Sequence, residues 1–100
     1  MAKFGELISG DVPVLLHFYL KNNAISEQMH DVVKEVANHF GDKARIIELN
    51  ADANREIVRA LQISSLPDFM IYKDGEMHWR KQGGQTSSVL KNALEDFTTP

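Results

Sequence analysis

The chain has 100 residues, of which 43% are hydrophobic and 25% are charged, with a formal net charge of −3. This composition predicts one globular domain over residues 1–100. The negative balance argues against a nucleic-acid partner, because phosphate binding needs a basic face. No apolar run reaches the roughly 18 residues of a membrane span, and the N-terminus lacks a signal-peptide pattern, so we expect a cytoplasmic protein. The absence of cysteine excludes disulfides, thiolate catalysis and cysteine-based metal sites.

The first half of the chain predicts a helix, a strand, a long helix and a second strand. Apolar residues at spacings of three and four favour a short helix over residues 3–9. Residues 14–20 are apolar on both faces, which is typical of a central strand covered by helices on each side. An amphipathic helix follows over residues 27–40, with Asn23 or Ser26 as its N-cap. Residues 45–50 form the second strand.

The second half predicts a helix, a hairpin and a last helix. The third helix begins at Asp52 or Asn54, and residues 69–72 form the third strand. Asp74-Gly75 is a hairpin turn signal, and the returning strand covers residues 77–82.

The last helix is capped by Thr86. Its core-facing positions are expected to be Val89, Leu90, Ala93, Leu94 and Phe97. The predicted order is therefore α-β-α-β-α-β-β-α, with a parallel first strand pair and an antiparallel last pair. Such an order indicates an α/β fold, in which a mixed four-stranded sheet is flanked by four helices.

Several short stretches resemble the thioredoxin family in their order and spacing. They are Pro13–Tyr19, Leu49–Asp52, Leu66-Pro67, Tyr72–Glu76 and Gly83. The resemblance covers nearly the whole chain and implies a thioredoxin-like fold with a cis peptide bond at Leu66-Pro67. Family members carry an extra N-terminal edge strand, and from its sequence pattern we expect this chain to lack that strand. The strand at residues 45–50 would then lie at an edge of the sheet.

The redox loop of that family, Trp-Cys-Gly-Pro-Cys-Lys, corresponds to residues 22–27. Asn23 replaces the attacking cysteine and Ser26 replaces the resolving cysteine. Disulfide exchange needs a thiolate that attacks and a second thiol that releases the mixed disulfide. A carboxamide cannot attack, and a serine needs a base at hydrogen-bond distance. We therefore expect no catalytic residue and no cofactor.

The family also carries a buried acid on its first central strand and a lysine on the neighbouring strand. His17 and Glu48 occupy these positions, so the charges are exchanged. One interpretation is a core histidine satisfied by a carboxylate. The alternative is a pH-responsive pair, because an adjacent carboxylate favours the charged imidazole.

The remaining histidines predict no metal site. His30 and His39 are nine residues apart on one helix, about half a turn out of phase, so they cannot converge on one ion. With His78, they are expected to be solvated surface residues.

The leading functional hypothesis is a redox-inactive module that binds a protein or an extended peptide. The resemblance implies a groove between the backbone before the cis-proline and the loop that lost its cysteines. The expected groove residues are Asn22, Asn23, Ala24, Ile25, Leu66, Pro67, Asp68 and Gly83. Asp68 either adds a carboxylate beside the groove or is a simple solvated aspartate.

Two alternatives stay open at this point. The chain could be a thiol-disulfide oxidoreductase, or a glutathione-handling relative that uses Ser26, whose cysteines are substituted in this sequence. It could also be a structural subunit that forms a homodimer or adds a partner strand along residues 45–50. Charges at Arg45 and Glu48 would instead protect that edge.

Overall fold

The computed structural model describes residues 2–98 and has the predicted order of elements. The helices are α1 (Ala2–Ile8), α2 (Ala24–Phe40), α3 (Arg55–Ala60) and α4 (Ser87–Thr98). The strands are β1 (Val14–Tyr19), β2 (Arg45–Asn50), β3 (Asp68–Lys73) and β4 (Glu76–Gln82). Short 3-10 turns, Gly41–Lys43 and Asp52–Asn54, precede β2 and α3. None of the helices in the described range is long and apolar enough to cross a membrane.

The four strands form one mixed sheet in the order β2-β1-β3-β4. β1 runs parallel to β2 and antiparallel to β3, and β3 and β4 form the antiparallel hairpin. The register places His17 opposite Glu48 on β2 and opposite Phe69 on β3. Among the described residues, β2 is therefore an edge strand, as the sequence predicted.

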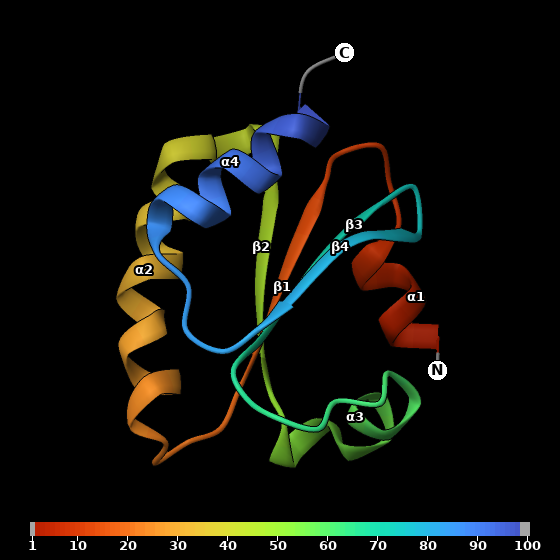
Figure 1. The fold of residues 1–100 in the computed structure, drawn as a ribbon. Coiled ribbons are helices and arrows are strands. Elements are labelled where there is room, and N and C mark those ends of the chain that lie inside the picture. Colours follow the sequence, from red (N-terminus) through yellow and green to blue (C-terminus); the bar gives the residue numbers. More distant parts are fainter. Residues whose placement is uncertain (1, 99–100) are drawn as a thin grey trace.

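Helices α2 and α4 cover one face of the sheet, and α1 and α3 cover the other (Figure 1). A hydrophobic core lies on each face. Leu15, Phe69 and Ile71 pack against α2 and α4 on one face. Alternate residues of the same strands point the other way, and there Leu16 and Met70 pack with side chains of α1 and α3. Burial on both faces explains why β1 is a nearly continuous apolar run.

Helix α2 begins three residues earlier than the sequence predicted, because Asn23 is its N-cap. The side-chain oxygen of Asn23 accepts a hydrogen bond from the backbone N–H of Ser26 at 2.9 Å. Ser26 consequently lies inside the first helical turn. Gly41 follows the helix with a positive φ of 55°, which glycine adopts without a steric penalty.

Two expectations for the other helices need correction. Val89 does not face the core, because 37% of its surface is exposed, whereas Leu90 and Leu94 are fully buried. Thr86 does cap α4, since its hydroxyl accepts from the N–H of Val89. Asn54 stands at the N-cap position of α3 without a side-chain cap hydrogen bond. The preceding turn is closed instead by the side chain of Asn50, which accepts from the N–H groups of residues 52 and 53.

Candidate functional site

Three segments that are far apart in the sequence meet at one end of the sheet. The Leu66–Pro67 peptide bond is cis, and the carbonyl oxygen of Pro67 accepts a hydrogen bond from the N–H of Gly83 at 2.8 Å. The adjacent Gly84 lies close to Ile25: a side-chain Cβ atom added at Gly84 would be 3.4 Å from the methyl carbon Cγ2 of Ile25, which is van der Waals contact. The loop after β4 thus joins the proline turn to the start of α2.

The N-terminus of α2 presents an apolar surface beside this junction. Ile25 is 51% exposed, which is unusual for a large aliphatic residue, and Ala24 is exposed next to it. Asn22 is exposed and has a positive φ of 69°, a conformation that asparagine tolerates better than most residues. The exposed surface at the start of α2 therefore consists of one polar turn residue, Asn22, and two apolar residues, Ala24 and Ile25.

A hollow of about 670 Å³ lies next to Leu66. Leu20, Val58, Ile63 and Leu66 supply its apolar lining. Exposed polar and charged side chains of α3 and the adjoining loop form its rim. Leu66 is half-buried and lies before β3 begins, so its backbone is outside the ladder of that strand.

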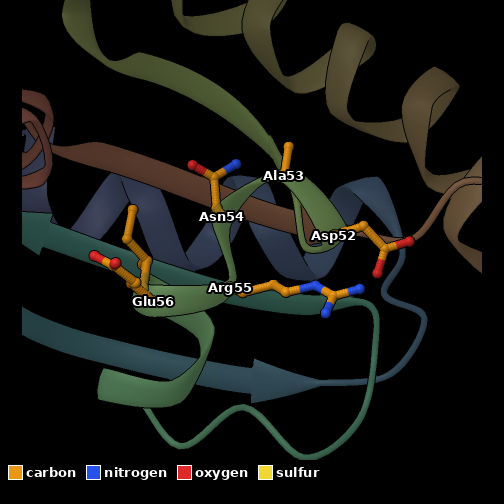
Figure 2. Close-up of a pocket in the computed structure, with 6 residues that line it drawn as sticks. Asp52, Ala53, Asn54, Arg55 and Glu56 are labelled. Atoms are coloured by element: carbon orange, nitrogen blue, oxygen red, sulfur yellow. The ribbon is translucent and has the colours of Figure 1, made fainter.

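A second hollow, of about 330 Å³, lies at the start of α3 and is lined by residues 52–57 (Figure 2). In Figure 2 the side chains of Asp52 and Arg55 point to one side, whereas those of Asn54 and Glu56 point to the other. These groups do not converge on one point.

Ser26 does not have the surroundings of a nucleophile. It is fully buried, and its hydroxyl oxygen accepts a hydrogen bond from the backbone N–H of Leu20 at 3.3 Å. Among residues 2–98, no histidine or carboxylate is hydrogen-bonded to that hydroxyl. A serine without a base remains a weak nucleophile. Asn23, at the position of the attacking cysteine, uses its side-chain oxygen as a helix cap.

Asp68 is neither a solvated aspartate nor a free carboxylate beside the groove. It is fully buried and pairs with Arg80 of β4, with 2.6 Å between Asp68 Oδ2 and Arg80 Nη2. The side-chain amide of Gln82 also donates to this carboxylate at 3.3 Å. The guanidinium of Arg80 in turn donates to the carbonyl oxygen of Leu61 at 3.0 Å. Both sequence interpretations of Asp68 were therefore wrong, and its role is structural.

The His17–Glu48 pair belongs to a larger cluster. The Nδ1 atom of His17 lies 2.8 Å from Glu48 Oε2, and the Nδ1 atom of His30 lies 2.6 Å from the same oxygen. His17 is fully buried and stacks on the ring of Phe69, with 4.7 Å between the ring centroids. The prediction that His30 is a solvated surface residue was wrong, because its side chain is only 33% exposed and holds this contact.

Burial lowers the pKa of His17 from its ordinary value. The hydrogen bond that Glu48 accepts from His17, and the negative charge of Glu48, act in the opposite direction, but they do not outweigh the cost of charging a buried ring. The lowered pKa leaves the imidazole neutral at neutral pH, which favours the interpretation of a core histidine over that of a charged pair. The other ring nitrogen, Nε2, has no hydrogen-bond partner among the described residues.

This sheet order, with paired helices on each face and a proline turn beside the start of α2, defines a thioredoxin-like protein. Comparison with known proteins agrees, since the sequence profile of the thioredoxin family matches residues 1–96. The chain belongs to the thioredoxin family.

Individual relatives and structures are similar over nearly the whole chain. A thioredoxin of Alicyclobacillus acidocaldarius is 32% identical over 95 residues, which cover 95% of this chain and 90% of that protein. A thioredoxin-like protein of Synechocystis is 28% identical over 97 residues, with 96% and 92% covered. The structure of a mutant thioredoxin from Halobacterium salinarum superposes with a TM-score of 0.90 at 22% identity, and covers 100% of this chain and 87% of the other. This structural likeness supports the fold.

Proposed function

We propose that residues 1–100 act as a redox-inactive, thioredoxin-like module that binds a protein segment in extended conformation. The binding site is the groove between Leu66-Pro67 and the loop at residues 22–25, with Gly83 at its end. Exposure of Ile25 beside Gly84 is the observation that carries this proposal. An isoleucine that is 51% exposed at a junction of three segments is suited to contact an apolar side chain of a partner.

The backbone at Leu66 supplies the second element of the proposed groove. Leu66 precedes β3 and adjoins the apolar lining of the 670 Å³ hollow. An extended peptide that pairs with free backbone groups gains main-chain hydrogen bonds, and neighbouring pockets select its side chains. The hollow would receive one apolar side chain of the peptide, and Ile25 would contact another.

The absence of redox activity rests on the residues that replace the cysteines. Asn23 is committed to the helix cap, and the hydroxyl of Ser26 is buried without a base. The glutathione-handling alternative requires Ser26 to contact a ligand. Titration with glutathione should therefore show no saturable binding, and binding that is lost in Ser26→Ala would favour that alternative instead.

A library of extended peptides tests the groove directly. We expect selected peptides to bind the wild-type chain and to bind Ile25→Asp at least about tenfold more weakly, since a charge would replace an apolar contact. Met77→Asp is the matched control, because Met77 is a similarly exposed apolar residue, 40% exposed, at the turn end of the β3–β4 hairpin, whereas Pro67 adjoins the opposite end. Equal loss of binding in both variants, or in neither, would contradict a site at the groove.

A homodimer or an added partner strand along β2 is the second candidate. The N–H groups of Arg45 and Ala51 donate inward to Pro13 and Tyr19. Because alternate residues of a strand point their N–H groups the same way, those of residues 46, 48 and 50 point to the free edge. Light scattering over a range of concentrations tests the dimer, which requires a mass that rises toward twice that of the 11.3 kDa chain.

A further inference from the structure

We propose that His17, His30 and Glu48 form a site for a divalent transition-metal ion such as Zn²⁺, with one ring nitrogen from each histidine and one carboxylate oxygen as ligands. The three ligand atoms all lie within 4.8 Å of one another. They come from β1, α2 and β2, three elements that the cores already hold together. The site is separate from the groove and does not depend on the proposed function.

The ligand set has the chemistry that zinc and related ions prefer. Imidazole nitrogen and carboxylate oxygen bind Zn²⁺ at about 2.0–2.2 Å, and two histidines with one glutamate are a known ligand combination. A histidine must offer an unprotonated nitrogen to bind a metal. The Nδ1 atoms of His17 and His30 face Glu48 Oε2 at 2.8 and 2.6 Å, so each would bind the ion in place of the proton that it now shares with this oxygen.

Only small movements are needed to admit an ion. At tetrahedral geometry, ligand atoms around Zn²⁺ are separated by about 3.3 Å. Glu48 Oε2 and the His17 nitrogen would therefore separate by about 0.5 Å from 2.8 Å, and Glu48 Oε2 and the His30 nitrogen by about 0.7 Å from 2.6 Å, through movement of Glu48 and His30. His17 is fixed by its stacking on Phe69, whereas His30 and Glu48 are about one-third exposed and can adjust their side chains.

The cluster is also accessible to an ion from solvent. A hollow of about 450 Å³ between α2 and β2 has His30 and Glu48 in its lining, with Asp31 and Lys34 beside them. Three protein ligands leave a fourth position open toward this hollow, which a water molecule can fill. The carboxylate of Asp31 favours the approach of a cation, and the ammonium of Lys34 opposes it.

One feature of the cluster limits the expected affinity. A metal-bound histidine normally donates its other N–H to an acceptor, and loss of such a partner weakens binding by about 10–100-fold. Nε2 of His17 has no partner within residues 2–98. We therefore expect binding that is weaker than in a fully supported zinc site, and a titration has to extend to correspondingly high zinc concentrations.

Titration of the full chain with Zn²⁺, followed by NMR of the histidine ring nitrogens, tests the site. We expect the Nδ1 signals of His17 and His30 to shift together, while those of the exposed His39 and His78 stay unchanged. Replacement of Zn²⁺ by Co²⁺ should give visible absorption bands of a four- or five-coordinate ion. No shift at any histidine, or shifts only at His39 or His78, would overturn the proposal.

Substitutions distinguish Zn²⁺ binding at the cluster from Zn²⁺ binding elsewhere on the protein surface. His30→Asn and Glu48→Gln alter side chains that are about one-third exposed, and each should weaken Zn²⁺ binding at least about tenfold. His39→Asn is the matched control on the same helix and should bind like the wild type. Equal affinity of the wild type, His30→Asn and Glu48→Gln would show that the ion binds elsewhere and would overturn the proposal.

Discussion

Asp68 and Arg80 form a buried ion pair that holds the start of β3 to β4 and to the loop after α3. Asp68 is fully enclosed, whereas the Arg80 side chain keeps 28% of its surface exposed. Two charges in the interior stabilise a fold only when they remain paired, because each alone carries a large desolvation cost. The consequences of removing one partner therefore depend on which charge is left behind.

Arg80→Met should lower the free energy of unfolding by about 3–5 kcal/mol, because it leaves the enclosed carboxylate without its cation. Asp68→Asn should cost less, since the guanidinium retains access to solvent and to the carbonyl of Leu61. Urea denaturation of both variants measures the difference. Equal stability of Arg80→Met and the wild type would show that the pair does not stabilise the fold.

The sequence predicted a contact between neighbouring strands better than a contact between a helix and the sheet. His17 and Glu48 were expected as neighbours because the resemblance to thioredoxins places a charged pair at these positions, and the register of β1 and β2 confirms that they lie opposite each other. His30 was missed, since helical spacing gives the face of a residue but not which strand residue it packs against. Asp68 was misjudged for a related reason: a register shift between Ile71 and Tyr72 decides which β4 side chain meets it.

Glu35 on α2 and Lys91 on α4 provide a pH-dependent contact between the two helices. The hydrogen bond from Lys91 Nζ, at 2.9 Å, is the main cause that lowers the pKa of Glu35. A lowered pKa in the folded state stabilises the fold above the unfolded-state pKa, and that stabilisation is lost as the pH falls through the folded-state value. Because both groups lie at the surface, the effect on stability is small.

Lys91→Met should raise the pKa of Glu35 toward its ordinary value, because the hydrogen bond and the positive charge are both removed. NMR titration of the Glu35 carboxyl measures the shift. The same titration of Glu95, which lies elsewhere on α4, serves as the internal control. An unchanged Glu35 pKa in the variant would mean that the contact with Lys91 does not persist in solution.

At the scale of elements, the start of α2 depends on one side chain. Asn23→Ala removes the acceptor for the Ser26 N–H and should lower the free energy of unfolding by about 1 kcal/mol, within a range of about 0.5–2. Asn23→Asp keeps an acceptor at the same place and should be close to the wild type in chemical denaturation. If Asn23→Ala were as stable as Asn23→Asp, the cap would not contribute to stability.

The elements themselves were largely predictable, and their ends were less so. β1 and the apolar stripe of α2 follow from hydrophobic periodicity. The helix was expected over residues 27–40 with Asn23 or Ser26 as its cap; the structure confirms Asn23, and Ser26 and Glu27 lie in the first turn. Val89 was wrongly assigned to the core-facing side of α4. It lies beside that side, and the adjacent Leu90, together with Leu94, packs into the core.

At the scale of the molecule, the sequence predicts the fold and the absence of the family's chemistry, but the groove needs the structure. Nothing in the sequence places Gly84 against Ile25, because the two are separated by most of the chain. Contact between them depends on how the loop after β4 returns past Pro67. The proposed groove would thus depend on the complete sheet, while Asn23 and Ser26 alone determine that no thiol stands in it.

This separation of fold from chemistry predicts that thiols can be restored without rebuilding the groove. The double variant Asn23→Cys, Ser26→Cys places one thiol at the N-cap of α2 and one in its first turn, where the helix N-terminus stabilises a thiolate. We expect the two cysteines to form a disulfide under oxidising conditions and, once reduced, to reduce a peptide disulfide. The wild-type chain should show no such activity, since it has no thiol.

Single and combined variants identify the origin of that activity. Asn23→Cys alone should attack a peptide disulfide and remain as the mixed disulfide, because no second thiol releases it. Addition of Ile25→Asp to the double variant should slow the reaction if the peptide docks against the exposed Ile25, whereas Met77→Asp should not. Mass spectrometry of the trapped adduct and the rate of peptide reduction measure both effects. Two free thiols that persist under oxidant would mean that residues 23 and 26 no longer have the geometry of the family's redox loop.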